Sequence, residues 1–154
     1  IIPRAVGHAR AMGMMQTFIN THPGSPRNKE ASDIIDKCRE KLEQKEYRAA
    51  ELYYAMGQYR AAAIAFATLL NNYPESKKGE EYKLRTVKSY YKFAKLSIAD
   101  KQLERYEKVV DEYEDFVDRY PESKLLKEAE SYSNLSKNHI KDIKNEQTQT
   151  SAKR

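Results

Sequence analysis

One eight-residue pattern occurs three times along the chain and constrains the fold more than any other feature. It occupies residues 18–25, 69–76 and 116–123, and each copy places an aromatic ring before a proline and a serine two residues after it. Proline disfavours helical geometry at the residue before it, so three helices should end near His22, Tyr73 and Tyr120. The serine hydroxyl can then cap the following helix. Corners at intervals of 51 and 47 residues predict a helical repeat architecture.

Apolar residues between these corners fall at three- and four-residue steps, which is the spacing of one helix face. They predict a helix from Pro26 to Met56 that Gly57 ends, and a returning helix from Tyr59 to Asn72. The apolar stripe of the first helix consists of Ala31, Ile35, Cys38, Leu42, Ala49, Leu52 and Met56. A third helix is marked by Leu84, Val87, Tyr91, Ala94 and Ile98, and a fourth covers residues 103–120.

The predicted fold class is therefore all-α, a solenoid of helical hairpins. The predicted domain spans residues 1–144, with an incomplete repeat at 1–25, repeats at 26–76 and 77–123, and a terminal helix at 124–144. Residues 145–154 are polar and predict a disordered tail. Residues 1–3 do not resemble the start of a signal peptide, and we interpret the chain as a fragment of a longer protein.

The net charge of +5 would fit a nucleic-acid partner, but its distribution argues against one. Residues 1–30 carry +3 and residues 141–154 carry +2, so the body between them is neutral. We therefore expect no nucleic-acid partner, and a nucleic-acid-binding repeat protein is kept as an alternative.

No residue pattern indicates catalysis, a metal site or a cofactor. The histidines stand far apart, at positions 8, 22 and 139, and Cys38 is single, so the spacing of metal ligands is missing. Cys38 falls on an apolar stripe and reads as a small buried hydrophobe. The carboxylates of residues 112–115 read as a solvated helix face, where their pKa stays ordinary. We expect a protein that is not an enzyme.

The window from Glu43 to Pro74 resembles a tetratricopeptide repeat, a family whose repeats are 34 residues long. The positions that match the pattern of that family are Tyr53, Gly57, Tyr59, Ala62, Phe66 and Pro74. Two positions depart from it, because Glu46 stands where tryptophan is usual and Ala50 where the first glycine is usual. The next interval is longer than 34 residues, so its helices should be extended.

A narrower resemblance is carried by residues 50–62, 87–91 and 120–129 together with the Tyr-Pro-Glu-Ser corners. These segments resemble the BamD family of outer-membrane assembly lipoproteins, in its Bacteroidetes form, and would be its C-terminal repeats. The resemblance implies a location on the periplasmic side of the outer membrane, with membrane attachment only through a lipid anchor outside this fragment. It implies scaffolding beside the barrel insertase BamA, its periplasmic POTRA region and other subunits of the machinery.

The charge differs sharply between two neighbouring predicted helices. Residues 77–101 hold eight basic groups and three acids, whereas residues 104–122 hold three basic groups and eight acids. Attraction between the two helices would explain this at a few tenths of a kcal/mol per exposed pair. Alternatively, because first helices of such repeats line the concave face, a basic groove would accept an acidic partner. The residues expected to face that groove are Gln44, Tyr47, Glu51, Tyr54, Glu81, Arg85, Lys88 and Lys92.

Taken together, these features predict a non-catalytic, protein-binding scaffold of the outer-membrane β-barrel assembly machinery. Another periplasmic repeat adaptor is the alternative within the same class. The 12 tyrosines should mostly fill seams between helices and keep their hydroxyls in water. Those expected to do so include Tyr53, Tyr59, Tyr73, Tyr106 and Tyr120.

Overall fold

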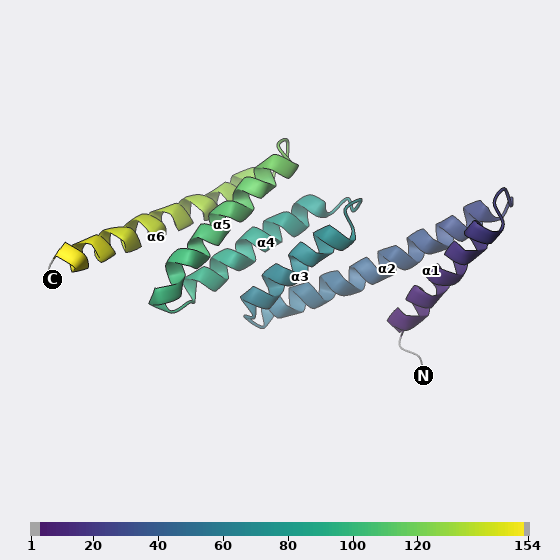
Figure 1. Cartoon of the computed structure of the whole chain (residues 1–154), viewed down its shortest axis with the longest axis horizontal. Helices are drawn as coiled ribbons and strands as arrows, with labels where there is room; N and C mark the ends of the chain where they lie inside the picture. Colours follow the sequence, from purple (N-terminus) through teal and green to yellow (C-terminus); the bar gives the residue numbers. More distant parts are fainter. Residues whose placement is uncertain (1–3, 153–154) are drawn as a thin grey trace. The chain divides into compact units, whose positions relative to one another are not determined.

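The computed structural model describes residues 4–152, and helices account for its regular structure (Figure 1). The helices are α1 (Arg4–Thr21), α2 (Asn28–Ala55), α3 (Tyr59–Asn72), α4 (Gly79–Lys95), α5 (Ala99–Arg119) and α6 (Leu126–Ala152). The predicted fold class is confirmed: the chain is an all-α, tetratricopeptide-like helical repeat protein. The absence of a signal peptide was predicted from residues 1–3, which lie outside the described residues.

The chain divides into two compact units, residues 1–48 and residues 49–154. The first unit contains α1 and most of α2, and the second contains the end of α2 together with α3 to α6. The division falls inside the predicted repeat 26–76. In the second unit α4 is the central helix, because it packs against α3, α5 and α6.

The three corners have the same backbone hydrogen bonds. At each corner the amide of the aromatic residue donates to the carbonyl four residues earlier, and the serine amide donates to the carbonyl of the aromatic residue. The three serine hydroxyls accept hydrogen bonds from the amides of Arg27, Lys78 and Leu125 at 3.1–3.3 Å. The predicted helix ends are therefore confirmed. The serines do not occupy the N-cap position that was predicted, because each helix begins three residues after its serine and the hydroxyl binds the amide just before the helix.

The apolar stripe predicted for α2 is right in its first half and wrong in its second. Ala31 and Cys38 are buried as expected, whereas Leu52 and Met56 are exposed and the buried residue near the helix end is Ala50. Ala50 follows the predicted Ala49 directly, so the face covered near the end of the helix lies about 100° around the axis from the predicted stripe. The predicted end of the helix is confirmed at Gly57, whose φ of +74° favours glycine.

The third predicted helix begins earlier and ends earlier than its apolar stripe indicates. Helix α4 starts at Gly79, where an added Cβ would collide with the Tyr120 hydroxyl, and it ends at Lys95. Ile98 was expected on the buried stripe, but it is the N-cap residue of α5 and is largely exposed. The step of four from Ala94 to Ile98 continues the helical spacing across a turn that the chain uses to reverse direction.

The prediction of a disordered tail is wrong for residues 145–152, which continue α6. This segment contains no glycine or proline to end the helix. In addition, the hydroxyls of Thr148 and Thr150 donate to the carbonyls of Lys144 and Glu146, four residues earlier.

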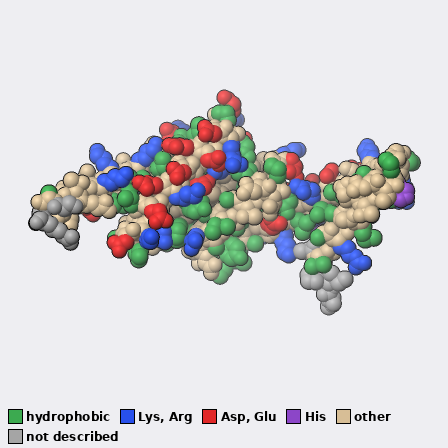
Figure 2. Space-filling model, in the orientation of Figure 1, with side chains coloured by type: hydrophobic (Ala, Val, Ile, Leu, Met, Phe, Trp, Pro, Cys, Tyr) green, Lys and Arg blue, Asp and Glu red, His purple; other side chains and the backbone are tan. Residues whose placement is uncertain are grey.

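The main core of the second unit lies between α4, α5 and α6. Its buried residues are Leu84, Val87, Tyr91, Ala94, Tyr106, Val109, Phe116 and Ala129. Tyr73 and Tyr106 are buried as expected of seam residues, but Tyr53 is exposed and fills no seam. On the face seen in Figure 2, acidic and basic side chains are interleaved over the part of this unit that contains α5.

Candidate partner-binding surface

Arg85 connects the end of α2 to α4 in the second unit. Its guanidinium donates a hydrogen bond to the carboxylate of Glu51 on α2 and forms an ion pair with it. The same group lies 5.8 Å from the ring centroids of both Tyr54 and Phe66, within the range of a cation–π contact. Arg85 is therefore already occupied by neighbours on two other helices.

Tyr54 lies beside this pair and also feels the positive charge of Lys88 on α4. Burial raises the pKa of the Tyr54 phenol, and the nearby Lys88 and Arg85 charges partly offset that rise. Its phenol is thus neutral at physiological pH and can donate or accept a hydrogen bond. Tyr59 packs edge-on against the Tyr54 ring, with 5.1 Å between the ring centroids.

Aromatic side chains continue from this cluster across α4 toward α6. Tyr132 on α6 is close enough to Tyr54 to contribute to the raised pKa of its phenol. The Tyr132 ring lies 5.2 Å from that of Tyr91, and Tyr106 stacks on His139 at 4.6 Å. Because Tyr91 and Tyr106 belong to the buried core, these ring pairs hold α6 against α4 and α5 and support the surface from beneath.

Of the predicted groove residues, the structure brings together Glu51, Tyr54, Arg85 and Lys88. Glu81 and Lys92 lie half-buried on α4 at helical spacings of four from Arg85 and from Lys88, which is the same helix face. Gln44, which is exposed, and Tyr47, which is half-buried, belong to the first unit. Their relation to the other six residues stays a prediction.

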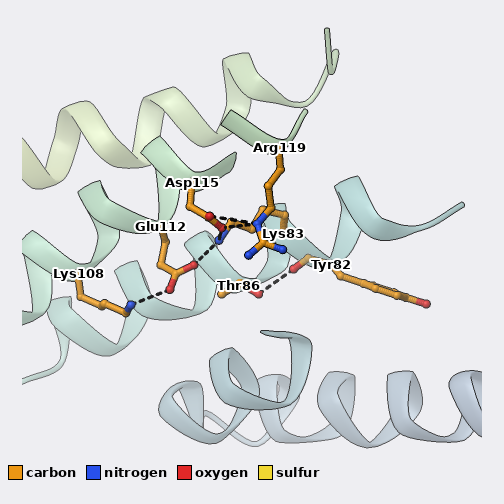
Figure 3. Close-up of polar contacts among 7 residues, drawn as sticks. All are labelled: Tyr82, Lys83, Thr86, Lys108, Glu112, Asp115 and Arg119. Atoms are coloured by element: carbon orange, nitrogen blue, oxygen red, sulfur yellow. Dashed lines mark hydrogen bonds and ion pairs between the residues drawn. The ribbon is translucent and has the colours of Figure 1, made fainter. Parts of the chain in front are cut away.

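Lys83 is part of the basic surplus of α4, but it points into the contact with α5 (Figure 3). Its side chain is only 5 % exposed, and its Nζ lies 2.5 Å from Glu112 Oε2 and 2.5 Å from Asp115 Oδ2. Lys108 and Arg119 each pair with one of the same carboxylates, at 2.8 and 2.9 Å. The attraction expected between the two helices is therefore carried by Lys83, through a partly buried network of ion pairs.

The interpretation of residues 112–115 as a solvated face is wrong for Glu112. Burial raises the pKa of the Glu112 carboxyl, but hydrogen bonds from Lys108 and Lys83 outweigh burial and hold it below its ordinary value. For Asp115 burial also raises the pKa, and hydrogen bonds from Lys83 and Arg119 again lower it overall. Both groups are held as carboxylates, which makes them structural ion-pair partners rather than proton donors at neutral pH.

An open apolar pocket of about 320 Å³ lies within the first unit. It is lined by Met14, Met15, Phe18, Arg27, Glu30, Ala31 and Ile34. Sequence reasoning missed this pocket, although Met15 and Phe18 at a spacing of three indicate one apolar face of α1.

Other candidate chemistry is sparse in the part of the chain that the structure describes. No group of three or more histidine, cysteine, aspartate or glutamate side chains in residues 4–152 could hold a metal ion. Cys38 is a buried free thiol, as predicted. No helix within the same range is long and apolar enough to cross a membrane.

Comparison with known proteins identifies the family to which the chain belongs. Residues 3–102 match the family described as YfiO, outer membrane lipoprotein. This supports the resemblance to a BamD-like family, while the Bacteroidetes form and the position of the chain within the full-length protein stay predictions. A comparison with curated proteins finds no match. Because the match covers 100 of the 154 residues, the chain belongs to the YfiO family of outer membrane lipoproteins.

Proposed function

We propose that this chain is a non-catalytic, protein-binding scaffold of BamD type within the outer-membrane β-barrel assembly machinery. The observation that carries the proposal is the family match over residues 3–102 in a helical repeat fold. The proposed location is the periplasmic side of the outer membrane, where a lipid anchor would hold the full-length protein. The proposed partners are the periplasmic POTRA region of BamA and other subunits of the machinery.

The surface proposed to meet the partner is the face of α4 that carries Lys88 and Lys92, beside Tyr54. The charge of Arg85 is neutralised by Glu51, and Lys83 forms its ion pair with α5. The charge that remains on this face for a partner is therefore that of Lys88, which lies near the Tyr54 phenol, and that of Lys92, and both residues are half-buried. Such a surface fits an acidic segment, because partly desolvated lysines attract carboxylates more strongly than fully solvated ones.

The function is tested by co-precipitation of the chain with the POTRA region of its cognate BamA. We expect the two to bind, and an absence of binding by full-length protein under conditions that keep the machinery intact would contradict the scaffold proposal.

The surface is tested separately by Lys88→Glu/Lys92→Glu. The matched control is Lys124→Glu/Lys127→Glu, which makes the same charge change at exposed positions near the start of α6. The groove variant should weaken binding by about tenfold or more, the control should not, and both should keep their helical circular dichroism. Equal binding by the two variants would exclude this face while leaving the scaffold proposal standing.

A further inference from the structure

Four exposed hydrophobic side chains of the second unit lie at one edge. Successive helices alternate in direction, so the α2–α3 turn and the α4–α5 turn lie at the same edge (Figure 1). Leu52 and Met56 are exposed at the first of these turns, and Leu96 and Ile98 are 72 % and 70 % exposed at the second. We call these four residues the apolar edge. The opposite edge has the polar Pro-Glu-Ser corners instead.

The α4–α5 turn is built to hold its two aliphatic side chains outward. Ile98 is the N-cap of α5 and provides no side-chain hydrogen bond to the helix. Serine, threonine or aspartate at an N-cap would stabilise a helix, whereas isoleucine is among the least favourable residues there. The chain therefore has a water-exposed isoleucine at a position where a polar residue would serve the fold better.

Polar contacts fix the backbone beneath these side chains. The Ser97 hydroxyl donates to the Phe93 carbonyl at 2.5 Å and accepts a hydrogen bond from Arg105 at 2.5 Å. The Arg105 guanidinium in turn lies 4.1 Å from the centroid of the Phe93 ring. A turn held in this way presents Leu96 and Ile98 without the entropy cost of ordering a flexible loop.

Basic groups outnumber acids in the two segments that carry the apolar edge. Residues 52–61 and 95–101 contain Arg60, Lys95 and Lys101 against the single acid Asp100. All four are exposed, and Lys101 makes one exposed ion pair, with Glu104 at 3.5 Å. Figure 2 shows hydrophobic, basic and acidic side chains together at the surface where α4 meets α5. Aliphatic tips within a basic rim match the two layers of an anionic membrane surface, whose headgroups attract cations and whose acyl region accepts apolar side chains.

We propose that the apolar edge docks on an anionic phospholipid surface, with Leu96 and Ile98 entering the boundary between headgroups and acyl chains. Membership of a family of outer membrane lipoproteins places such a surface within reach of the fold. This contact is separate from any lipid anchor, and it adjoins the partner-binding face of α4, because Leu96 lies one turn beyond Lys92.

The chain contains no tryptophan, so a single introduced tryptophan reports on its own surroundings. Leu96→Trp should shift its fluorescence emission to the blue when vesicles of phosphatidylcholine and phosphatidylglycerol are added, and brominated acyl chains should quench it. Leu135→Trp, at an exposed position in the middle of α6, is the matched control and should show neither effect. An emission from Leu96→Trp that does not change when vesicles are added, or equal responses from the two variants, would overturn the proposal.

Vesicle sedimentation tests the energetics with the full 154-residue chain. Leu96→Asp/Ile98→Asp should lower the partition coefficient on anionic vesicles by about tenfold or more, and Leu135→Asp should not lower it. Equal binding to vesicles of phosphatidylcholine alone would refute the role of the basic rim. If the chain ignores vesicles but a photo-crosslinker at position 96 captures the BamA POTRA region, the edge is a protein contact and the membrane proposal is wrong.

Discussion

Replacing Lys83 with methionine tests how much the buried ion network stabilises the fold. The Lys83 ammonium is shared by Glu112 and Asp115, at 2.5 Å from each. Methionine keeps an unbranched side chain that can follow the path of the lysine stem, so packing against α5 should change little. The loss of stability then reports mainly on the missing charge.

The expected loss of stability depends on the ion-pair partner that each carboxylate retains. Removing one partner of a fully buried ion pair costs about 3–5 kcal/mol. Glu112 is 13 % exposed and retains Lys108, while Asp115 is 42 % exposed and retains Arg119. Because neither carboxylate becomes an isolated buried charge, we expect Lys83→Met to lower the free energy of unfolding at pH 7 by about 2 kcal/mol, below that range.

Urea unfolding followed by far-ultraviolet circular dichroism measures this difference. Lys101→Met is the matched control, because it removes an exposed ion pair to Glu104 and should cost less than about 0.5 kcal/mol. A second variant, Lys83→Met/Glu112→Leu, removes both charges and should recover part of the loss. If Lys83→Met costs no more than Lys101→Met, the network does not stabilise the protein and the reasoning is refuted.

Three further predictions concern pH and two glycines. The pKa values of Glu112 and Asp115 in the folded protein lie below their ordinary values of 4.5 and 3.8. Above the ordinary values, these two carboxylates stabilise the fold fully. That stabilisation is lost as the pH falls through the pKa values of the folded protein. Urea midpoints measured from pH 7 to pH 2 should therefore fall less steeply in Lys83→Met than in the unaltered chain. Gly57→Ala should cost about 1 kcal/mol by urea unfolding, because φ is +74° although nothing lies within 4 Å of the added Cβ. Gly79→Ala should cost about 1–2 kcal/mol by its contact with the Tyr120 hydroxyl, and Tyr120→Phe in the same chain should recover part of that loss.

The corners and helix ends could be predicted from the sequence because their causes are local. A proline acts on the residue directly before it, and a serine hydroxyl reaches an amide two residues later, so no knowledge of neighbouring helices is needed. The predicted returning helix from Tyr59 to Asn72 coincides with α3 for the same reason. Gly57 marks one border by its positive φ, and Pro74 marks the other by its effect on Tyr73.

The faces of the helices could not be predicted equally well, because they depend on what packs against each turn. Leu52 and Met56 fit an apolar stripe by spacing, yet the neighbouring helices cover Ala50 instead. Ala49 and Ala50 are equally apolar, so the pattern alone does not decide which of the two is covered. The same limit applies to Ile98, since apolar spacing continues across a reversal of the chain that only the packing of α5 on α4 determines.

The candidate surface shows why the total charge of a helix differs from the charge that is accessible to a partner. Helix α4 touches α3, α5 and α6, so each basic residue is assigned to a neighbour by its direction around the helix axis. Lys83 faces the carboxylates of α5, and Arg85 faces Glu51. Lys88 and Lys92 lie one and two turns beyond Arg85, where the end of α2 supplies the Tyr54 phenol as a neighbour. A partner that recognises this face should therefore respond to two charges, and Lys88→Glu/Lys92→Glu should remove most of the salt dependence of its binding.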